Sequence, residues 1–132
     1  NCWNITMNLP TDLKYAATHE WVRVENYNTV RVGITEFAQQ ELGDLVFIEL
    51  PELGRKLAEQ ERGAIDEAVK TASELYSPVA GEVVAVNQAV IDEPEIVNDD
   101  PYGAWLFCIK SDDLSAVNRL MSAQEYGLTI AE

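Results

Sequence analysis

The sequence is poor in the residues that build metal centres and nucleophilic catalytic sites. It has two cysteines, Cys2 and Cys108, and a single histidine, His19. There is no Cys-x-x-Cys pair, so a structural zinc site would have too few ligands. With one histidine and no nucleophile beside it, a catalytic triad is excluded. We interpret both cysteines as free thiols of a protein from a reducing compartment.

The chain is also short of basic residues and of long apolar runs. Nine Lys and Arg stand against 23 Asp and Glu, which gives a formal net charge of −14. This charge disfavours binding to nucleic acid and to anionic membrane surfaces, because both would repel it. It favours docking against basic patches on partner proteins. No apolar run approaches the roughly 20 residues that a membrane span needs.

The length and composition fit one globular domain. The 132 residues are 47% hydrophobic, which is enough to bury a single core. Residues 1–6 do not belong to the pattern that begins at Met7, and they have neither the cationic start nor the apolar stretch of a signal peptide. We expect these six residues to be a vector-derived or upstream-translated extension, and residues 7–132 to form the domain.

Most of the chain has the pattern of a β protein. Short apolar or alternating runs bounded by Pro, Gly and Asn predict strands. The strand of residues 45–50 is apolar on both faces, with Val46, Ile48 and Leu50 pointing one way and Leu45 and Phe47 the other, so we expect it to be central in its sheet. The expected strands end the segment 13–24 and occupy 29–32, 45–50, 83–86 and 105–110.

One short helix interrupts the strands. Thr35 has the side chain of a good N-cap, and Gly43 suits the position just beyond the last turn. Phe37, Ala38 and Leu42 share one side of this helix, and we expect all three to lie in the core.

The last third of the chain predicts a loop followed by helices. Residues 87–103 hold two prolines and five acids with no basic residue among them, so we expect a loop. Asp112 or Asp113 can cap a helix that runs to residue 121. Ser122 and Glu125 then have the spacing of a capping box, which predicts a last short helix.

Lys70 is the centre of a distinctive segment. The two residues on either side of it are uncharged, and the Pro and Gly of residues 77–81 predict a turn between extended segments. Most lysines in this setting are solvated surface amines. No Asn-Gly or Asp-Gly pair marks a hairpin turn at Lys70 itself.

The motif Glu67-Ala-Val-Lys70, followed by Ser73-Glu-Leu-Tyr-Ser-Pro-Val-Ala-Gly81, resembles the lipoyl-attachment signature of the glycine cleavage H-protein family. Thr18-His-Glu-Trp21 and Asn98-Asp-Asp-Pro-Tyr-Gly103 are further matches, so the resemblance covers roughly residues 7–132. It implies a lipoyl/biotinyl-type hammerhead fold, a flattened β-barrel with a short internal helix and C-terminal helices. It also implies lipoate in amide linkage on Lys70, with Glu67 as part of the attachment motif.

The resemblance further implies a non-enzymatic carrier in the cytoplasm of a bacterium, or in the mitochondrial matrix of a eukaryote. Its partners would be a pyridoxal-phosphate glycine decarboxylase, a folate-dependent aminomethyltransferase, dihydrolipoamide dehydrogenase and a lipoate-attaching enzyme. Thr18, Glu20 and Glu74 match the family positions that line a cleft for the amine of the loaded arm. Glu74 stands where many members have Asp.

Other functions stay open beside this one. A lipoyl domain of a 2-oxoacid dehydrogenase would usually be shorter and would lack both the Thr18–Trp21 motif and the loop from Asp99 to Gly103. A paralogue that relays lipoate to those complexes is not distinguished by these residues. A biotin carrier usually has methionines on both sides of its lysine, where Val69 and Thr71 stand here. A hydrolase would need an acid–base constellation that the sequence does not supply. A plain interaction module would leave Lys70 free of lipoate in cells that make it.

Overall fold

The computed structural model describes residues 8–131. The expected extension of residues 1–6, with Cys2, lies outside the described residues. The helices are α1 (Glu36–Leu42), α2 (Gln88–Asp92), α3 (Glu95–Asp99), α4 (Ser115–Asn118) and α5 (Ala123–Ile130). The strands are β1 (Lys14–Tyr15), β2 (Glu20–Asn26), β3 (Thr29–Ile34), β4 (Leu45–Glu49), β5 (Lys56–Leu57), β6 (Arg62–Ala68), β7 (Ala72–Tyr76), β8 (Gly81–Val86) and β9 (Phe107–Lys110).

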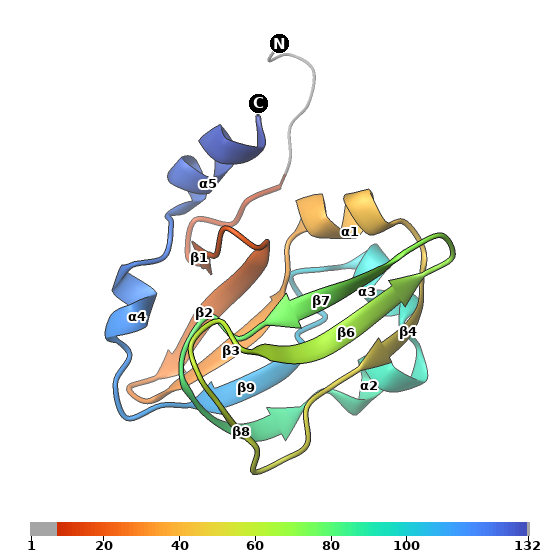
Figure 1. Cartoon of the computed structure of the whole chain (residues 1–132). Helices are drawn as coiled ribbons and strands as arrows, with labels where there is room; N and C mark the ends of the chain where they lie inside the picture. Colours follow the sequence, from red (N-terminus) through yellow and green to blue (C-terminus); the bar gives the residue numbers. More distant parts are fainter. Residues whose placement is uncertain (1–7, 132) are drawn as a thin grey trace.

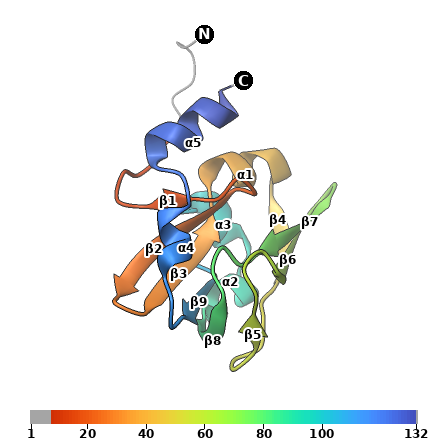
Figure 2. The same cartoon turned by 60° about the vertical axis from the view of Figure 1, so that its left-hand side comes forward.

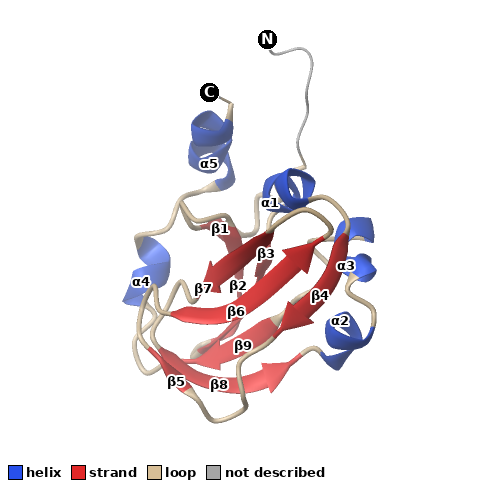
Figure 3. Ribbon diagram, turned by 45° about the vertical axis from the view of Figure 1, so that its right-hand side comes forward, coloured by secondary structure: helices blue, strands red, loops and turns tan. Residues whose placement is uncertain are grey.

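The strands form two antiparallel sheets that face each other (Figures 1 and 3). The larger sheet has the order β1-β2-β3-β9-β8-β5, and the smaller one has the order β4-β6-β7. In Figure 2 the smaller sheet stands apart from the larger one, while α5 lies at the end of the molecule near β1. The expected mainly β fold with a short internal helix and C-terminal helices is therefore confirmed.

Two groups of buried side chains hold this arrangement together. The main core lies between the sheets and is rich in β-branched residues that fit pleated surfaces. A smaller aromatic cluster lies under α5. Gly33 pairs with Trp21 across β2 and β3, and a Cβ at residue 33 would overlap the indole ring. The smaller cluster consists of Leu13, Tyr15, Trp21, Tyr102, Ala123 and Tyr126.

Helix α1 begins and ends as the sequence predicts. The side chain of Thr35 accepts a hydrogen bond from the N–H three residues on, and Gly43 follows the helix with a φ of 84°. Ala38 and Leu42 are half-buried against the main core. Phe37 instead packs on the imidazole of the only histidine. The expectation that all three apolar side chains enter the core is thus right for two of them.

The prediction that the strand 45–50 is central is wrong. Strand β4 is an edge of the smaller sheet, and β6 is its centre. A register shift between Leu45 and Phe47 breaks the alternation, so that Leu45 and Ile48 are buried while Val46 and Phe47 are 56% and 46% exposed. A bulge of this kind changes which side chains face the core.

The expected loop of residues 87–103 contains two short helices. Asn87 caps α2 through its side chain, and Pro94 precedes α3. Each helix buries one valine, Val90 or Val97, against the main core. Two separate single-turn segments are too short to show helical periodicity in a stretch rich in prolines and acids.

The C-terminal helices are shorter than the apolar pattern suggests. Helix α4 has Leu114 at its N-cap and no side-chain cap, although Asp113 accepts the N–H of Ser115. The predicted capping box of Ser122 and Glu125 is confirmed at the start of α5. None of the helices in the described part of the chain is long and apolar enough to cross a membrane.

Candidate functional site

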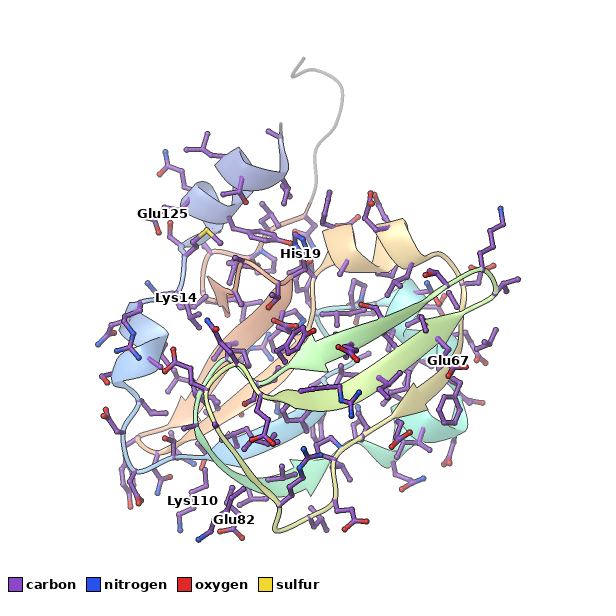
Figure 4. All side chains as sticks on the ribbon, viewed as in Figure 1. Lys14, His19, Glu67, Glu82, Lys110 and Glu125 are labelled. Atoms are coloured by element: carbon purple, nitrogen blue, oxygen red, sulfur yellow. The ribbon has the colours of Figure 1, made fainter. Side chains whose placement is uncertain are left out.

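Lys70 lies in the turn of the β6–β7 hairpin, which projects from the body of the molecule (Figure 1). The last ladder pair is Glu67 with Ala72, and the N–H of Ala68 donates to the carbonyl of Thr71 across 2.7 Å. Lys70 is therefore presented to solvent at the tip of two paired strands, and Figure 4 shows Glu67 on β6 close to this end.

The turn lacks an Asn-Gly signal because it does not need one. Asn and Gly are favoured in hairpin turns whose central residues have positive φ. The described non-glycine residues with positive φ are His19 and Gln60, so Val69 and Lys70 have ordinary negative φ values. A turn of this kind accepts most residue types, and sequence patterns therefore do not reveal it.

Lys70 differs from the three other lysines of the chain in its place in the fold. Lys14, Lys56 and Lys110 lie in strands, where they pair with neighbouring strands. All four ion pairs among residues 8–131 use arginine, so no described acid holds the ammonium group of Lys70.

The surface beside Lys70 is apolar. Val69 is 75% exposed, and the exposed Phe47 of β4 pairs with Glu67 of β6. An exposed valine and phenylalanine on either side of an acidic residue form a surface that another protein could cover.

A cleft of about 290 Å³ lies near the other end of β7. Thr18 and Glu20 both line it, together with Tyr76. The Thr18 hydroxyl donates to the Glu20 carboxylate, and the backbone N–H of Tyr76 donates to the same carboxylate across 3.1 Å. Glu20 thus connects β2 of the larger sheet to the open edge of β7 in the smaller one.

Glu20 is an unusual acid because its side chain is almost fully buried. It is 1% exposed. The pKa of Glu20 is raised from its ordinary 4.5 to about 7, mainly by burial and to a smaller extent by the nearby Asp66 carboxylate. The hydrogen bonds from Thr18 and Tyr76 favour the charged form and act against this rise. The sequence motif locates Glu20, but only the packing of the two sheets buries it.

Glu74 does not line the cleft. It is exposed on β7, where the Tyr76 hydroxyl donates to its carboxylate across 2.9 Å and Arg62 donates across 3.0 Å. Those two hydrogen bonds lower the pKa of Glu74. The structure therefore brings Thr18 and Glu20 together, and it connects Glu74 to the cleft only through Tyr76.

Asp66 is a buried acid that motif analysis missed. It is 1% exposed on β6, and neither carboxylate oxygen has a hydrogen-bond partner. Burial raises the pKa of Asp66 from 3.8 to about 6. The signal in the sequence is positional, because the buried Ala64 and Ala68 stand two residues to either side and so face the same way.

Cys108 is a free thiol, as expected from the sequence. It is 6% exposed in β9, and burial raises its pKa. The buried thiol does not contribute to the cleft.

Comparisons with known proteins give one consistent result. The family model described as "Glycine cleavage H-protein" matches residues 13–132. A glycine cleavage system H protein of Idiomarina loihiensis is 54% identical over 126 residues, covering 95% of this chain and 98% of that protein. One from Anoxybacillus flavithermus is 54% identical over 121 residues, covering 91% and 94%. The crystal structure of a glycine cleavage system H protein from Mycobacterium marinum superposes with a TM-score of 0.84 at 40% identity, covering 93% of this chain and 99% of that one.

Proposed function

The chain belongs to the glycine cleavage H-protein family and is a non-catalytic carrier of the glycine cleavage system, and on this premise we propose that it carries lipoate in amide linkage on Lys70. The observation that supports the site is the place of Lys70 at the exposed tip of the β6–β7 hairpin, unpaired by any described acid. A lipoyl group bound there would supply a disulfide that accepts an aminomethyl group. Residues 7–132 would form a single carrier domain.

The surface around Lys70 also supports a role in recognition by the lipoate-attaching enzyme. Glu67 belongs to the last paired position before the turn that holds Lys70. Val69 and Phe47 expose apolar surface beside Glu67. An enzyme that reads position rather than sequence alone needs such fixed neighbours, and a paired hairpin keeps them in place. We assign Glu67 to this recognition surface.

The other proposed partners follow from membership of the system. They are the glycine decarboxylase, the aminomethyltransferase and dihydrolipoamide dehydrogenase, each of which must reach an arm attached to Lys70. The compared relatives are bacterial, which supports a cytoplasmic setting in a bacterium. The projecting hairpin suits a carrier that visits several active sites in turn.

The first prediction is that Lys70 is the sole lipoylation site. Lys70→Arg keeps the positive charge but cannot form the amide in the normal reaction, so intact mass after co-expression with a lipoate ligase should show no lipoyl increment. Lys56→Arg, at an exposed lysine in strand β5, is the matched control and should show the full increment. A lipoyl increment that persists in Lys70→Arg would refute the assignment.

We also propose that Thr18, Glu20 and Glu74 protect the amine of the loaded arm. An aminomethyl thioether loses its cargo when the nitrogen lone pair expels the thiolate, which leaves an iminium ion that water converts to formaldehyde and ammonia. Protonating the amine occupies that lone pair. A carboxylate in a partly dry cleft favours the ammonium form.

The geometry supports this role most directly for Glu20. Its carboxylate is held in the cleft by Thr18 and by the N–H of Tyr76, and an ammonium group beside it would favour its charged form. Lys70 and Tyr76 are six residues apart, roughly 20 Å along an extended strand. Glu74 stands on β7 between Lys70 and Tyr76, on the strand that joins the proposed attachment site to the cleft.

The second prediction is that Glu20→Gln and Glu74→Gln leave lipoylation intact but speed spontaneous release of formaldehyde from the loaded carrier. Because Glu20→Gln loses a charge-assisted contact in a buried site, it should speed formaldehyde release by about tenfold or more. Glu74 is exposed and screened by solvent, so its effect should be smaller. Release is measured without any transferase. Rates equal to the parent protein's in both variants would rule out this role.

A further inference from the structure

The residue between the two cleft residues Thr18 and Glu20 has an unusual backbone conformation. His19 has a φ of 77°, in the left-handed region that side chains rarely adopt. It closes the β1–β2 hairpin loop, in which the N–H of His19 donates to the carbonyl of Ala16 and the N–H of Ala16 donates to the carbonyl of Glu20. Glycine is the usual residue at such a loop position.

The side chain of His19 points away from the cleft and into a hydrogen-bonded chain. Its Nδ1 lies 2.8 Å from the Tyr126 hydroxyl, which lies 2.8 Å from the Thr35 hydroxyl. The N–H of Ala38 donates to that Thr35 oxygen, so Thr35 can donate to Tyr126 and Tyr126 to the imidazole. Burial lowers the pKa of His19, which favours the neutral imidazole that accepts at Nδ1.

This series of hydrogen bonds joins parts of the molecule that are far apart in sequence. His19 and Tyr126 are separated by 107 residues, and Figure 4 shows His19 between α5 and α1. The ring of His19 also packs on Phe37 of α1, with centroids 4.9 Å apart. A strained backbone persists when several such contacts determine it, and strain of this kind often marks a functional position.

Helix α5 packs against Tyr15, a residue that lines the same cleft. The ring of Tyr126 stacks on Tyr15 with centroids 4.9 Å apart and an interplanar angle of 10°. Tyr15 lines the cleft and exchanges two backbone hydrogen bonds of 2.8 Å with Met121, another lining residue just before α5. Tyr126 therefore contacts both His19, which lies between Thr18 and Glu20, and Tyr15 of the neighbouring strand β1.

We propose that His19 and Tyr126 are positioning residues, through which α5 fixes the loop that carries Thr18 and Glu20 in the orientation that protects the cargo. This inference rests on the proposed role of Glu20 in the cleft. His19 supplies no group to the cleft itself, because its side chain is turned toward α5 and α1. His19 acts by fixing the backbone conformation of its two neighbours, Thr18 and Glu20.

Two variants separate positioning from stability. His19→Gly removes the imidazole but suits the left-handed backbone, so it should still fold, with a melting temperature lowered by the lost packing on Phe37 and the lost hydrogen bond to Tyr126. Tyr126→Phe keeps the buried ring and its stacking on Tyr15 and removes only the hydroxyl. Gln124→Ala, on the exposed face of α5, is the matched control.

The first readout uses the protein without lipoate. NMR titration of the Glu20 carboxyl should show that both variants move its pKa toward 4.5 by about one unit or more, because a loosened loop admits water to the carboxylate. Gln124→Ala should titrate like the parent protein. The second readout is formaldehyde release from the loaded carrier, which both variants should speed by about fivefold.

The outcomes distinguish this inference from the proposed function. An unchanged Glu20 titration and unchanged release in both folded variants would overturn the positioning role. If Glu20→Gln speeds release and the His19 and Tyr126 variants do not, the positioning role also fails while the role of Glu20 stands. If both variants shift the titration but Glu20→Gln leaves release unchanged, the positioning role holds and the proposed protection by the cleft fails.

Discussion

Two buried acids distinguish this chain at the scale of single residues. Glu20 has partners for its charge, since Thr18 and the N–H of Tyr76 both donate to it. Asp66 has none, although it is equally buried. A buried carboxylate without partners is expensive to ionise, so Asp66 destabilises the folded state wherever it is charged.

This difference gives a pH-dependent prediction for Asp66. Its pKa is about 6 when folded and 3.8 ordinarily, so between these values the folded protein keeps a proton that the unfolded chain has lost. The free energy of unfolding should therefore fall as pH rises from about 4 to 6, by about 3 kcal/mol in all. Glu20 is the titratable group that interacts with Asp66, and its own raised pKa should lower the free energy of unfolding further as pH rises to about 7.

The test compares Asp66→Asn with the parent protein by urea unfolding at pH 4.5 and pH 8. The variant cannot ionise at residue 66, so it should lose less stability between the two pH values. Glu49→Gln removes an exposed acid of the neighbouring strand and should behave like the parent. An equally large fall in Asp66→Asn would show that Asp66 is not the source of the pH dependence.

At the scale of elements, local signals set helix ends but not strand positions. The Thr35 cap and the Ser122–Glu125 capping box are local contacts within four residues, and the structure has both. The place of β4 at a sheet edge depends on its pairing with β6, about twenty residues further along the chain. Both faces of β4 are apolar, which in sequence suggests a central strand. An apolar face that the fold leaves exposed cannot be told apart, from residue type alone, from one that the core covers.

The exposed face of β4 and the turn of the β6–β7 hairpin lie beside each other. The exposed Phe47 of β4 and Val69 of the turn flank Glu67. An apolar surface next to the proposed attachment lysine suits an element that the proposed partner proteins would cover. The same property makes β4 look like a core strand in sequence.

At the scale of the whole molecule the dominant property is the charge of −14. Only four ion pairs neutralise acids among residues 8–131; three of them are exposed, and the Arg31–Glu25 pair is half-buried. The carrier is therefore surrounded by a negative field, which would attract basic patches on the proposed partners. Charge of this kind speeds encounter more than it strengthens the final complex.

The last prediction concerns this field. The apparent KM of the glycine decarboxylase for this carrier should rise with sodium chloride, because the screening length falls to about 8 Å at physiological ionic strength and about 3 Å at 1 M. Sucrose, which adds no ions, is the control and should not change the apparent KM measured without salt. An apparent KM that does not change from low to moderate salt would mean that shape, not charge, governs docking.

The sequence by itself determined the mainly β class, both ends of α1 and the start of α5, and it led to the proposal of Lys70 as the attachment site. These depend on short-range rules, namely alternation, capping and a motif that can be read within a few residues. Lys70 in particular was found through its motif, since a turn with negative φ values leaves no signature in residue type.

Only the tertiary structure decided which residues share an environment. It buries Glu20 between two sheets, leaves Glu74 outside the cleft, and sets His19 against Tyr126 across 107 residues. Burial and pKa depend on every atom packed around a group, most of which come from distant parts of the chain. For this reason the sequence proposes Thr18 and Glu20 for the site, whereas the packing of β2, β7 and α5 sets their chemistry.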